Sequence, residues 1–252
     1  MGLQELEERL ALAREAGDAK NTANLLFKIG VARGRGGEPE PALEAFQEAY
    51  LTCRANANDQ GQLAVLKKVV ELMIDLGREE EAVQGLSTGF ELAGKLADLS
   101  SRVELLNLSA RISLSRGELE KGAKSLLSAM EICRDHDDRI GELLTLEKLG
   151  PVLRKAGQME PALESYSRMA DLAKEAGDAV RQALALVGVG QLSAVLGRPR
   201  EALKNLEAAR SLYLRAGLKV WAEMVGQEIE RLSDSSAKGK AAGAPDPDRQ
   251  ES

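Results

Sequence analysis

Apolar and polar residues follow one another along this chain with the spacing of amphipathic helices. In residues 62–76, for example, the apolar residues Leu63, Leu66, Val70 and Met73 lie three or four positions apart. This spacing places their side chains on one stripe of an α-helix. Because similar segments recur along most of the chain, the pattern predicts a protein built from amphipathic helices.

The pattern also repeats with a period of 40 residues, over five units and without an insertion. Self-similarity at a fixed period is the signature of a repeat architecture. One repeating position is glycine: Gly37, Gly77, Gly117, Gly157 and Gly197. Another is polar: Asp18, Asn58, Asp98, Asp138 and Asp178. A third is small and lies four residues before a large residue: Ala42, Ala82, Gly122, Ala162 and Ala202 precede Phe46, Leu86, Leu126, Tyr166 and Leu206.

Each unit predicts two helices joined by tight turns. In the second unit the first helix covers residues 62–76 and the second covers about residues 79–96. Gly77 lies between them, where a chain leaving a helix often needs a left-handed residue. The Asp/Asn position offers an oxygen that caps the next first helix. The small positions mark places where two helices approach closely.

These units account for the chain. We expect an all-α fold, a right-handed α-solenoid of about twelve helices in which each unit buries its apolar face on its neighbours. Residues 1–18 match a second helix and form an N-terminal half-repeat, and residues 219–233 match a first helix that caps the stack. Residues 234–252 lack apolar periodicity, which predicts a disordered tail. The full repeats are 19–58, 59–98, 99–138, 139–178 and 179–218.

The order of small and large residues resembles the tetratricopeptide repeat. Leu26 and Gly30 in a first helix, followed by Phe46 in the second, show this order. The period exceeds the usual length of about 34 residues. It resembles the long-helix variant of partner-of-Inscuteable adaptors, kinesin light chains and Rap-type regulators, which the segment DDRIGE at 137–142 also matches closely. The resemblance covers residues 1–233 and implies a concave groove, lined by first helices, that binds other proteins.

Composition restricts the chemistry that the chain can perform. It holds one His and two Cys among 252 residues. A zinc site needs four N or S ligands, and a nucleophile paired with His would have to use His136. We interpret Cys133 as a core residue that precedes an exposed turn. We therefore predict no catalytic residue, no metal and no cofactor, so the protein is not an enzyme.

Charge and hydropathy restrict the partners. The net charge of −6 argues against nucleic acid as a partner. No run of 18 apolar residues is present, so we expect no membrane insertion. The first residues lack the basic start and apolar core of a signal peptide, and the sparse cysteines suit a reducing compartment. These features predict a cytoplasmic protein whose partner is a protein or peptide.

Positions on the first helices that face the predicted groove carry more basic than acidic residues. The candidate partner-binding residues are Lys28, Lys67, Lys68, Arg111, Lys148, Arg154 and Lys155, with the apolar Leu144, Leu184 and Val187. The acidic residues at such positions are Glu71, Asp75, Glu104 and Glu147. One interpretation is a groove for an acidic peptide or helix, attracted by the local field. The other is a solvated helix face with i,i+4 pairs such as Lys67–Glu71.

The first helix of the fifth repeat, residues 180–196, differs from the others. It carries no charge at its groove positions and is apolar nearly all round, which predicts that it is covered on every side. Either the terminal helix with Trp221 and Met224 covers it, or a partner or a second subunit does.

Together these features predict a non-catalytic adaptor or scaffold that binds an acidic or amphipathic segment of another protein in its groove. The Rap resemblance implies an alternative, a peptide-sensing regulatory subunit of a signalling or enzyme complex. A third possibility is a self-assembling scaffold, because the unpaired helix of residues 1–18 can dock on the exposed end of another copy.

Overall fold

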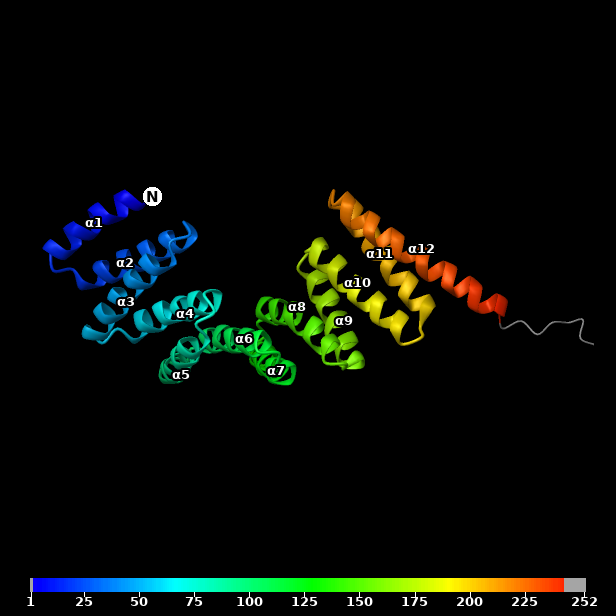
Figure 1. Ribbon diagram of the computed structural model, residues 1–252, viewed down its shortest axis with the longest axis horizontal. Coiled ribbons are helices and arrows are strands. Elements are labelled where there is room, and N and C mark those ends of the chain that lie inside the picture. Colours follow the sequence, from blue (N-terminus) through cyan, green and yellow to red (C-terminus); the bar gives the residue numbers. More distant parts are fainter. Residues whose placement is uncertain (1, 243–252) are drawn as a thin grey trace, which may run out of the picture. The chain divides into compact units, whose positions relative to one another are not determined.

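The computed structural model describes residues 2–242, with side chains described as far as Asp234. This part of the chain consists of twelve α-helices and contains no strand, which confirms the all-α prediction. Turns of three residues separate the helices, and consecutive helices within α1–α7 and within α8–α12 form antiparallel hairpins (Figure 1). The helices are α1 (Leu3–Glu15), α2 (Ala19–Arg35), α3 (Pro39–Ala55), α4 (Asp59–Asp75), α5 (Glu79–Lys95), α6 (Leu99–Ser115), α7 (Leu119–Asp135), α8 (Arg139–Lys155), α9 (Met159–Glu175), α10 (Ala179–Val195), α11 (Pro199–Arg215) and α12 (Lys219–Ala242).

All turns between these helices share one backbone form. The middle residue has a positive φ and is glycine in eight of the eleven turns, five of which hold the predicted glycines. In the turn after α1, the Gly17 N–H donates to the Arg14 carbonyl (3.1 Å) and the Asp18 N–H donates to the Ala13 carbonyl (3.0 Å). These bonds satisfy carbonyl groups at the helix end. The middle residues that are not glycine are Ala57, Ala97 and Asp137, with φ of 49°, 49° and 53°.

The polar position of the repeat caps the first helix of each of the five repeats, as predicted. A carboxylate oxygen of Asp98 accepts a hydrogen bond from the Ser101 N–H (2.9 Å), and one of Asp178 accepts from the Arg181 N–H (2.9 Å). These backbone bonds favour the ionised carboxylate and lower the pKa of Asp98 and of Asp178. Asp18, Asn58 and Asp138 make the same bond.

Small residues admit large side chains between helices, also as predicted. A Cβ atom added at Gly30 would lie 2.6 Å from the ring of Phe46, and one added at Gly150 would lie 2.8 Å from the ring of Tyr166. The Tyr166 ring also faces Gly188 of α10, where an added Cβ would lie 2.6 Å away. Tyr166 is buried, and burial raises the pKa of its phenol. One ring from α9 therefore packs against glycines of both α8 and α10.

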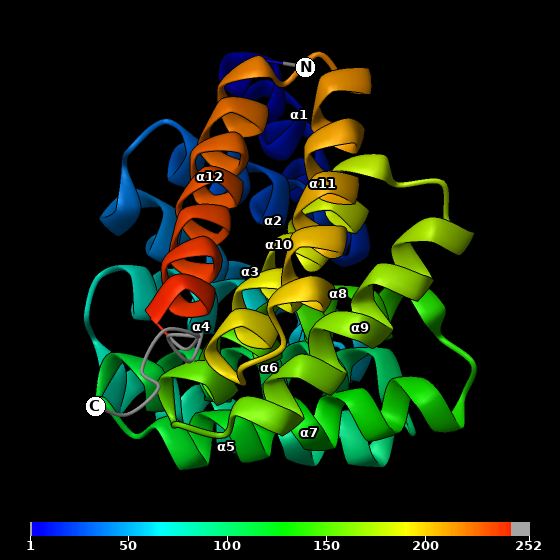
Figure 2. The same ribbon diagram turned by 90° about the vertical axis from the view of Figure 1, so that its right-hand side faces the viewer.

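The chain forms two compact units, Met1–His136 and Asp137–Ser252, which we call unit 1 and unit 2. We expected one continuous solenoid over residues 1–233, whereas the structure divides at the turn between α7 and α8. All residues from 134 to 140, around this turn, are exposed. Unit 1 has α2, α4 and α6 as its first helices, and α2 contacts α4 as α4 contacts α6. Unit 2 has α8, α10 and α12; Figure 2 shows its helices α10, α11 and α12 packed in succession.

The C-terminal helix ends later than expected. α12 runs to Ala242, so residues 234–242 are helical where their composition predicted disorder. This segment holds mostly Ser, Ala and Lys and no proline, and an existing helix extends through such residues at little free-energy cost. The remainder of the predicted tail, 243–252, lies outside the described residues.

Candidate functional site

The first helices of unit 1 enclose a cavity of about 380 Å³ between α2 and α4. The ring of Phe46, from α3, lines the buried side of the cavity and is 3% exposed. It fits there because Gly30 has no side chain. Apolar side chains of Val31 and Leu72 stand on opposite walls, and charged side chains surround the opening. The lining residues are Gly30, Val31, Gly34, Arg35, Phe46, Lys68, Glu71, Leu72 and Asp75.

Most of the basic residues predicted for the unit 1 groove are paired with carboxylates. The ion pairs are Lys68–Glu71 within α4 (2.7 Å), Lys67–Glu104 between α4 and α6 (2.9 Å) and Arg111–Asp75 between α6 and α4 (2.5 Å). The remaining basic candidate, Lys28 of α2, is exposed. Lys67 pairs with Glu104 and not with Glu71, because its side chain is only 18% exposed and is directed towards α6. The predicted basic excess of unit 1 is therefore largely neutralised within the chain.

The basic residues of unit 2 are less compensated. Arg154 of α8 donates a hydrogen bond to the amide oxygen of Gln191 on α10 (2.9 Å), which is a neutral group. Its neighbour Lys155 is exposed and has no ion pair within the described part of the chain. Lys148, about two turns earlier than Lys155 on α8, is exposed. The C-terminal end of α8, at Arg154 and Lys155, therefore presents positive charge to the solvent.

Polar side chains connect the three first helices of unit 2. Arg181 of α10 donates to Glu147 of α8 (2.9 Å), and this bond is the largest cause of the raised pKa of Arg181. The amide nitrogen of Gln191 donates to Glu228 of α12 (3.1 Å). Together with the Arg154–Gln191 bond, these contacts show that α8, α10 and α12 lie next to one another on one face of unit 2.

Apolar side chains remain exposed on the same face. The predicted candidates Leu144 and Leu184 are each 40% exposed, and Val187 is half-buried. The expectation that the terminal helix covers α10 is wrong, because Trp221 and Met224 of α12 are themselves 52% and 57% exposed. α12 instead continues the stack and packs against α11. The described chain therefore buries or half-buries most of the first helix of the fifth repeat but leaves Val180, Leu184 and Val195 exposed.

Sequence reasoning missed three exposed residues of this face. Ile140, Val180 and Val220 occupy the same repeat position, one turn before Leu144, Leu184 and Met224. They lie close to the start of each first helix, outside the positions that we assigned to the groove. The available signal was the change from polar to apolar residues at this position between the third and the fourth repeat.

A buried ion pair holds α8 against α9. Glu142 is 2% exposed and accepts hydrogen bonds from Nε (3.0 Å) and Nη2 (2.9 Å) of Arg168. The two bonds to Glu142 are the largest cause of the raised pKa of Arg168. Such bidentate pairs fix orientation as well as charge. This pair positions the helix that carries the exposed basic residues of unit 2.

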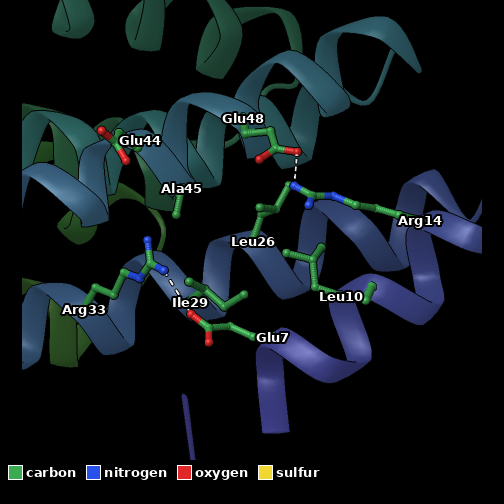
Figure 3. A pocket seen from close by; sticks show the side chains of 10 residues that line it. Glu7, Leu10, Arg14, Leu26, Ile29, Arg33, Glu44, Ala45 and Glu48 are labelled. Carbon is green, nitrogen blue, oxygen red and sulfur yellow. Dashed lines mark hydrogen bonds and ion pairs between the residues drawn. The ribbon is translucent and has the colours of Figure 1, made fainter. Parts of the chain in front are cut away.

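A second cavity, of about 320 Å³, lies between α1, α2 and α3 in unit 1 (Figure 3). Its apolar side chains are Leu10, Leu26 and Ile29. Arg33 binds Glu7 (2.9 Å) and Arg14 binds Glu48 across the cavity. Because both arginines already have carboxylate partners, this cavity links α1 to its neighbours and presents no uncompensated basic group to a ligand.

Other types of site are not apparent in the described chain. Cys53 and Cys133 are buried, and burial raises the pKa of the Cys53 thiol. Among the described residues, no group of three or more His, Cys, Asp or Glu side chains is placed to hold a metal ion. No helix within residues 2–242 is both long and apolar enough to cross a membrane.

No protein-family model matches this chain, and no curated protein matches its sequence. Several solved structures share its fold. A Signal Transduction ATPase with Numerous Domains from Pyrococcus horikoshii, which has a tetratricopeptide repeat sensor, gives a TM-score of 0.69 at 16% identity over 89% of this chain. The matched part is 36% of that protein, so this chain spans about a third of its length.

Two further structures resemble the chain over most of its length. BtubC (BKLC) from P. vanneervenii gives a TM-score of 0.67 at 14% identity, covering 99% of this chain and 95% of that one. A Rap protein complexed with Competence and Sporulation Factor gives a TM-score of 0.59 at 12% identity, covering 91% of this chain and 74% of that one. At these identities the likeness shows the fold alone. The chain has the fold of a tetratricopeptide-type helical repeat protein.

Proposed function

We propose that this protein is a non-catalytic adaptor that binds an acidic or amphipathic segment of a partner protein on its first helices. The observation that carries this proposal is the first-helix face of unit 2. There, exposed apolar side chains such as Leu144 and Leu184 share the first helices with Arg154 and Lys155, which lie at the C-terminal end of α8 and have no carboxylate partner in the described chain. Such a surface favours a segment that brings apolar side chains together with negative charge.

The structural neighbours support an interaction role. The Rap protein is complexed with Competence and Sporulation Factor, and the ATPase of Pyrococcus horikoshii carries its tetratricopeptide repeats as a sensor. The composition supports a non-catalytic role, because the chain has a single His and its two cysteines are buried. The same scarcity of cysteine suits the cytoplasm.

Capture of partners from native cell extract tests the proposal. The full chain is immobilised as wild type, as the face variant Arg154→Glu/Lys155→Glu and as the control Arg200→Glu/Lys204→Glu, and bound proteins are identified by mass spectrometry. The control reverses two exposed charges on α11, a second helix of the same unit. We expect the face variant to lose partners that the wild type and the control retain. Retention of the same partners by all three proteins contradicts the proposal.

A further inference from the structure

Six exposed apolar residues form a regular array on the first helices of unit 2. Each of α8, α10 and α12 contributes two of them, four positions apart and therefore on one side of the helix. The pairs are Ile140 and Leu144 (70% and 40% exposed), Val180 and Leu184 (45% and 40%), and Val220 and Met224 (68% and 57%). We call this array the apolar stripe. It crosses the three helices near their N-terminal ends.

The fold itself does not require apolar residues at these positions. In unit 1 the same repeat positions hold Lys20 and Asn24 on α2, Gln60 and Ala64 on α4, and Ser100 and Glu104 on α6, all exposed. Unit 1 thus forms the same helical hairpins with largely polar residues at these positions. Since contiguous exposed apolar surface marks interaction sites in soluble proteins, the stripe needs an explanation other than folding.

We infer that the apolar stripe of unit 2 docks an amphipathic, acidic α-helix of the partner protein, laid across α8, α10 and α12. This inference rests on the proposed function and specifies the site and the form of the bound segment. The six side chains of the stripe carry no polar group. An extended segment would leave its backbone N–H and C=O groups unpaired against them, whereas a helix satisfies these groups internally.

The geometry also sets the spacing of apolar residues in the partner. Helices α8, α10 and α12 meet through long side chains such as Arg154 and Gln191, so their axes lie at or beyond the upper end of the roughly 8–10 Å of directly packed helices, and a helix rises about 1.5 Å per residue. A helix that crosses α8, α10 and α12 therefore meets one apolar pair about every seven residues. The bound segment should carry apolar residues at i, i+7 and i+14. A second apolar residue should follow each of these three or four positions later, so that the whole segment covers about 18 residues.

Charge selects the acidic helix. Arg154 and Lys155 follow Leu144 on α8 by ten and eleven residues, about 15 Å along the helix axis. Arg154 contacts a neutral amide, and Lys155 has no ion pair in the described chain. Acidic residues on the side of the bound helix that faces the C-terminal end of α8 are attracted by these groups. The chain's own residues 243–252 are a poor occupant, because their only apolar side chains are those of Ala and Pro.

Binding of designed peptides tests the inference, with Trp221 as the reporter. Trp221 is the only tryptophan of the chain. It is half-exposed and directly follows the stripe residue Val220 on α12. The probe is an 18-residue peptide with Leu at the spacing given above and Glu on its remaining faces. One comparison peptide has Lys in place of Glu, and another has the same composition with the Leu positions scrambled. Binding is measured by calorimetry and by the emission of Trp221 on the full chain.

We expect the acidic probe to bind with a blue shift of Trp221 emission, the Lys peptide to bind at least about tenfold more weakly, and the scrambled peptide not to bind. The variant Val180→Ser/Leu184→Glu, which carries the residues of α6, should weaken binding at least about tenfold. Ile140→Lys/Leu144→Asn, which carries the residues of α2, is an independent second variant. The control Leu214→Ser removes an exposed apolar residue from α11 and should leave binding unchanged.

Three results overturn the inference. The first is equal binding of the scrambled peptide, and the second is unchanged binding by both stripe variants with a native circular dichroism spectrum. The third is a wild-type dimer in sedimentation that the stripe variants dissociate, which identifies a second copy as the occupant. In each case the proposed function stands if captured partners are still lost on reversal of Arg154 and Lys155. It fails separately if that reversal changes nothing.

Discussion

The contact between Gly150 and Tyr166 shows how the repeats set the spacing of their helices. The Tyr166 ring lies between Gly150 of α8 and Gly188 of α10, so it cannot move away when a methyl group is added at either position. Other repeats have a different pair of residues at the equivalent positions. The third repeat has Ala110 opposite Leu126 in the equivalent places. This difference suggests a double-variant test of the packing.

We predict that Gly150→Ala changes stability in opposite directions in two backgrounds. In the wild type, the added Cβ lies 2.8 Å from the Tyr166 ring. Overpacking of this kind costs about 1–3 kcal/mol, which exceeds the helix-propensity gain of about 1 kcal/mol from Ala over Gly. With Tyr166→Leu in place, the pair becomes Ala and Leu, as in the third repeat, and the propensity gain remains. Since the propensity gain is the same in both backgrounds, the coupling free energy should equal the overpacking cost, about 1–3 kcal/mol.

Urea unfolding of the four proteins measures this coupling. Trp221 lies in unit 2, so its fluorescence reports the unfolding of the unit that contains both substitutions. The expected result is that Gly150→Ala lowers the unfolding midpoint of the wild type and raises that of the Tyr166→Leu variant. The reasoning is refuted if Gly150→Ala destabilises both backgrounds equally, because the ring would then not be what excludes the methyl group.

Three further predictions concern a turn, an ion pair and a helix cap. Ala97 has a positive φ of 49°, so Ala97→Gly should raise the free energy of unfolding by about 0.5–1 kcal/mol; a lower thermal midpoint contradicts this. Glu142→Gln should lower the free energy of unfolding by about 2 kcal/mol, because the charge of Arg168 loses its bidentate partner; an unchanged urea midpoint contradicts this. The pKa of Asp98 is lowered in the folded state, first of all by the bond from the Ser101 N–H. Its contribution is therefore present above the ordinary Asp pKa of about 4 and is lost as the pH falls through the folded-state pKa. Asp98→Asn keeps the cap acceptor and should flatten the acid limb of the stability profile, whereas identical profiles for both proteins contradict the assignment.

Local features of the fold could be predicted from the sequence. Gly37 and Asp18 act within one turn of the chain, through a left-handed backbone and a cap, so their repetition reveals the helix boundaries directly. Ala57 and Ala97 adopt the same left-handed conformation, but no local preference of Ala marks them. At these two turns the sequence therefore marks the boundary through the capping residue that follows, Asn58 or Asp98, and not through the left-handed residue itself.

Features that depend on the contact between repeats could not be predicted in the same way. Lys67 has Glu71 on its own helix, yet it pairs with Glu104 because α6 packs beside it. The boundary between the two units falls at the turn between α7 and α8, although the spacing of that turn in the sequence does not differ from the others. Likewise, helix α10 is apolar nearly all round, but only the packing of α12 shows that Leu184 remains exposed.

Lysine footprinting of the complex with a captured partner tests the central claim, that partners bind on the first helices, most directly. Lys155 at the end of α8 and Lys204 on α11 are both exposed and belong to the same unit. Acetylation of each lysine, with and without the partner, is quantified by mass spectrometry. We predict that the partner lowers the reactivity of Lys155 several-fold and leaves that of Lys204 unchanged. Protection of Lys204 with no change at Lys155 would place the partner on the second helices and contradict this account.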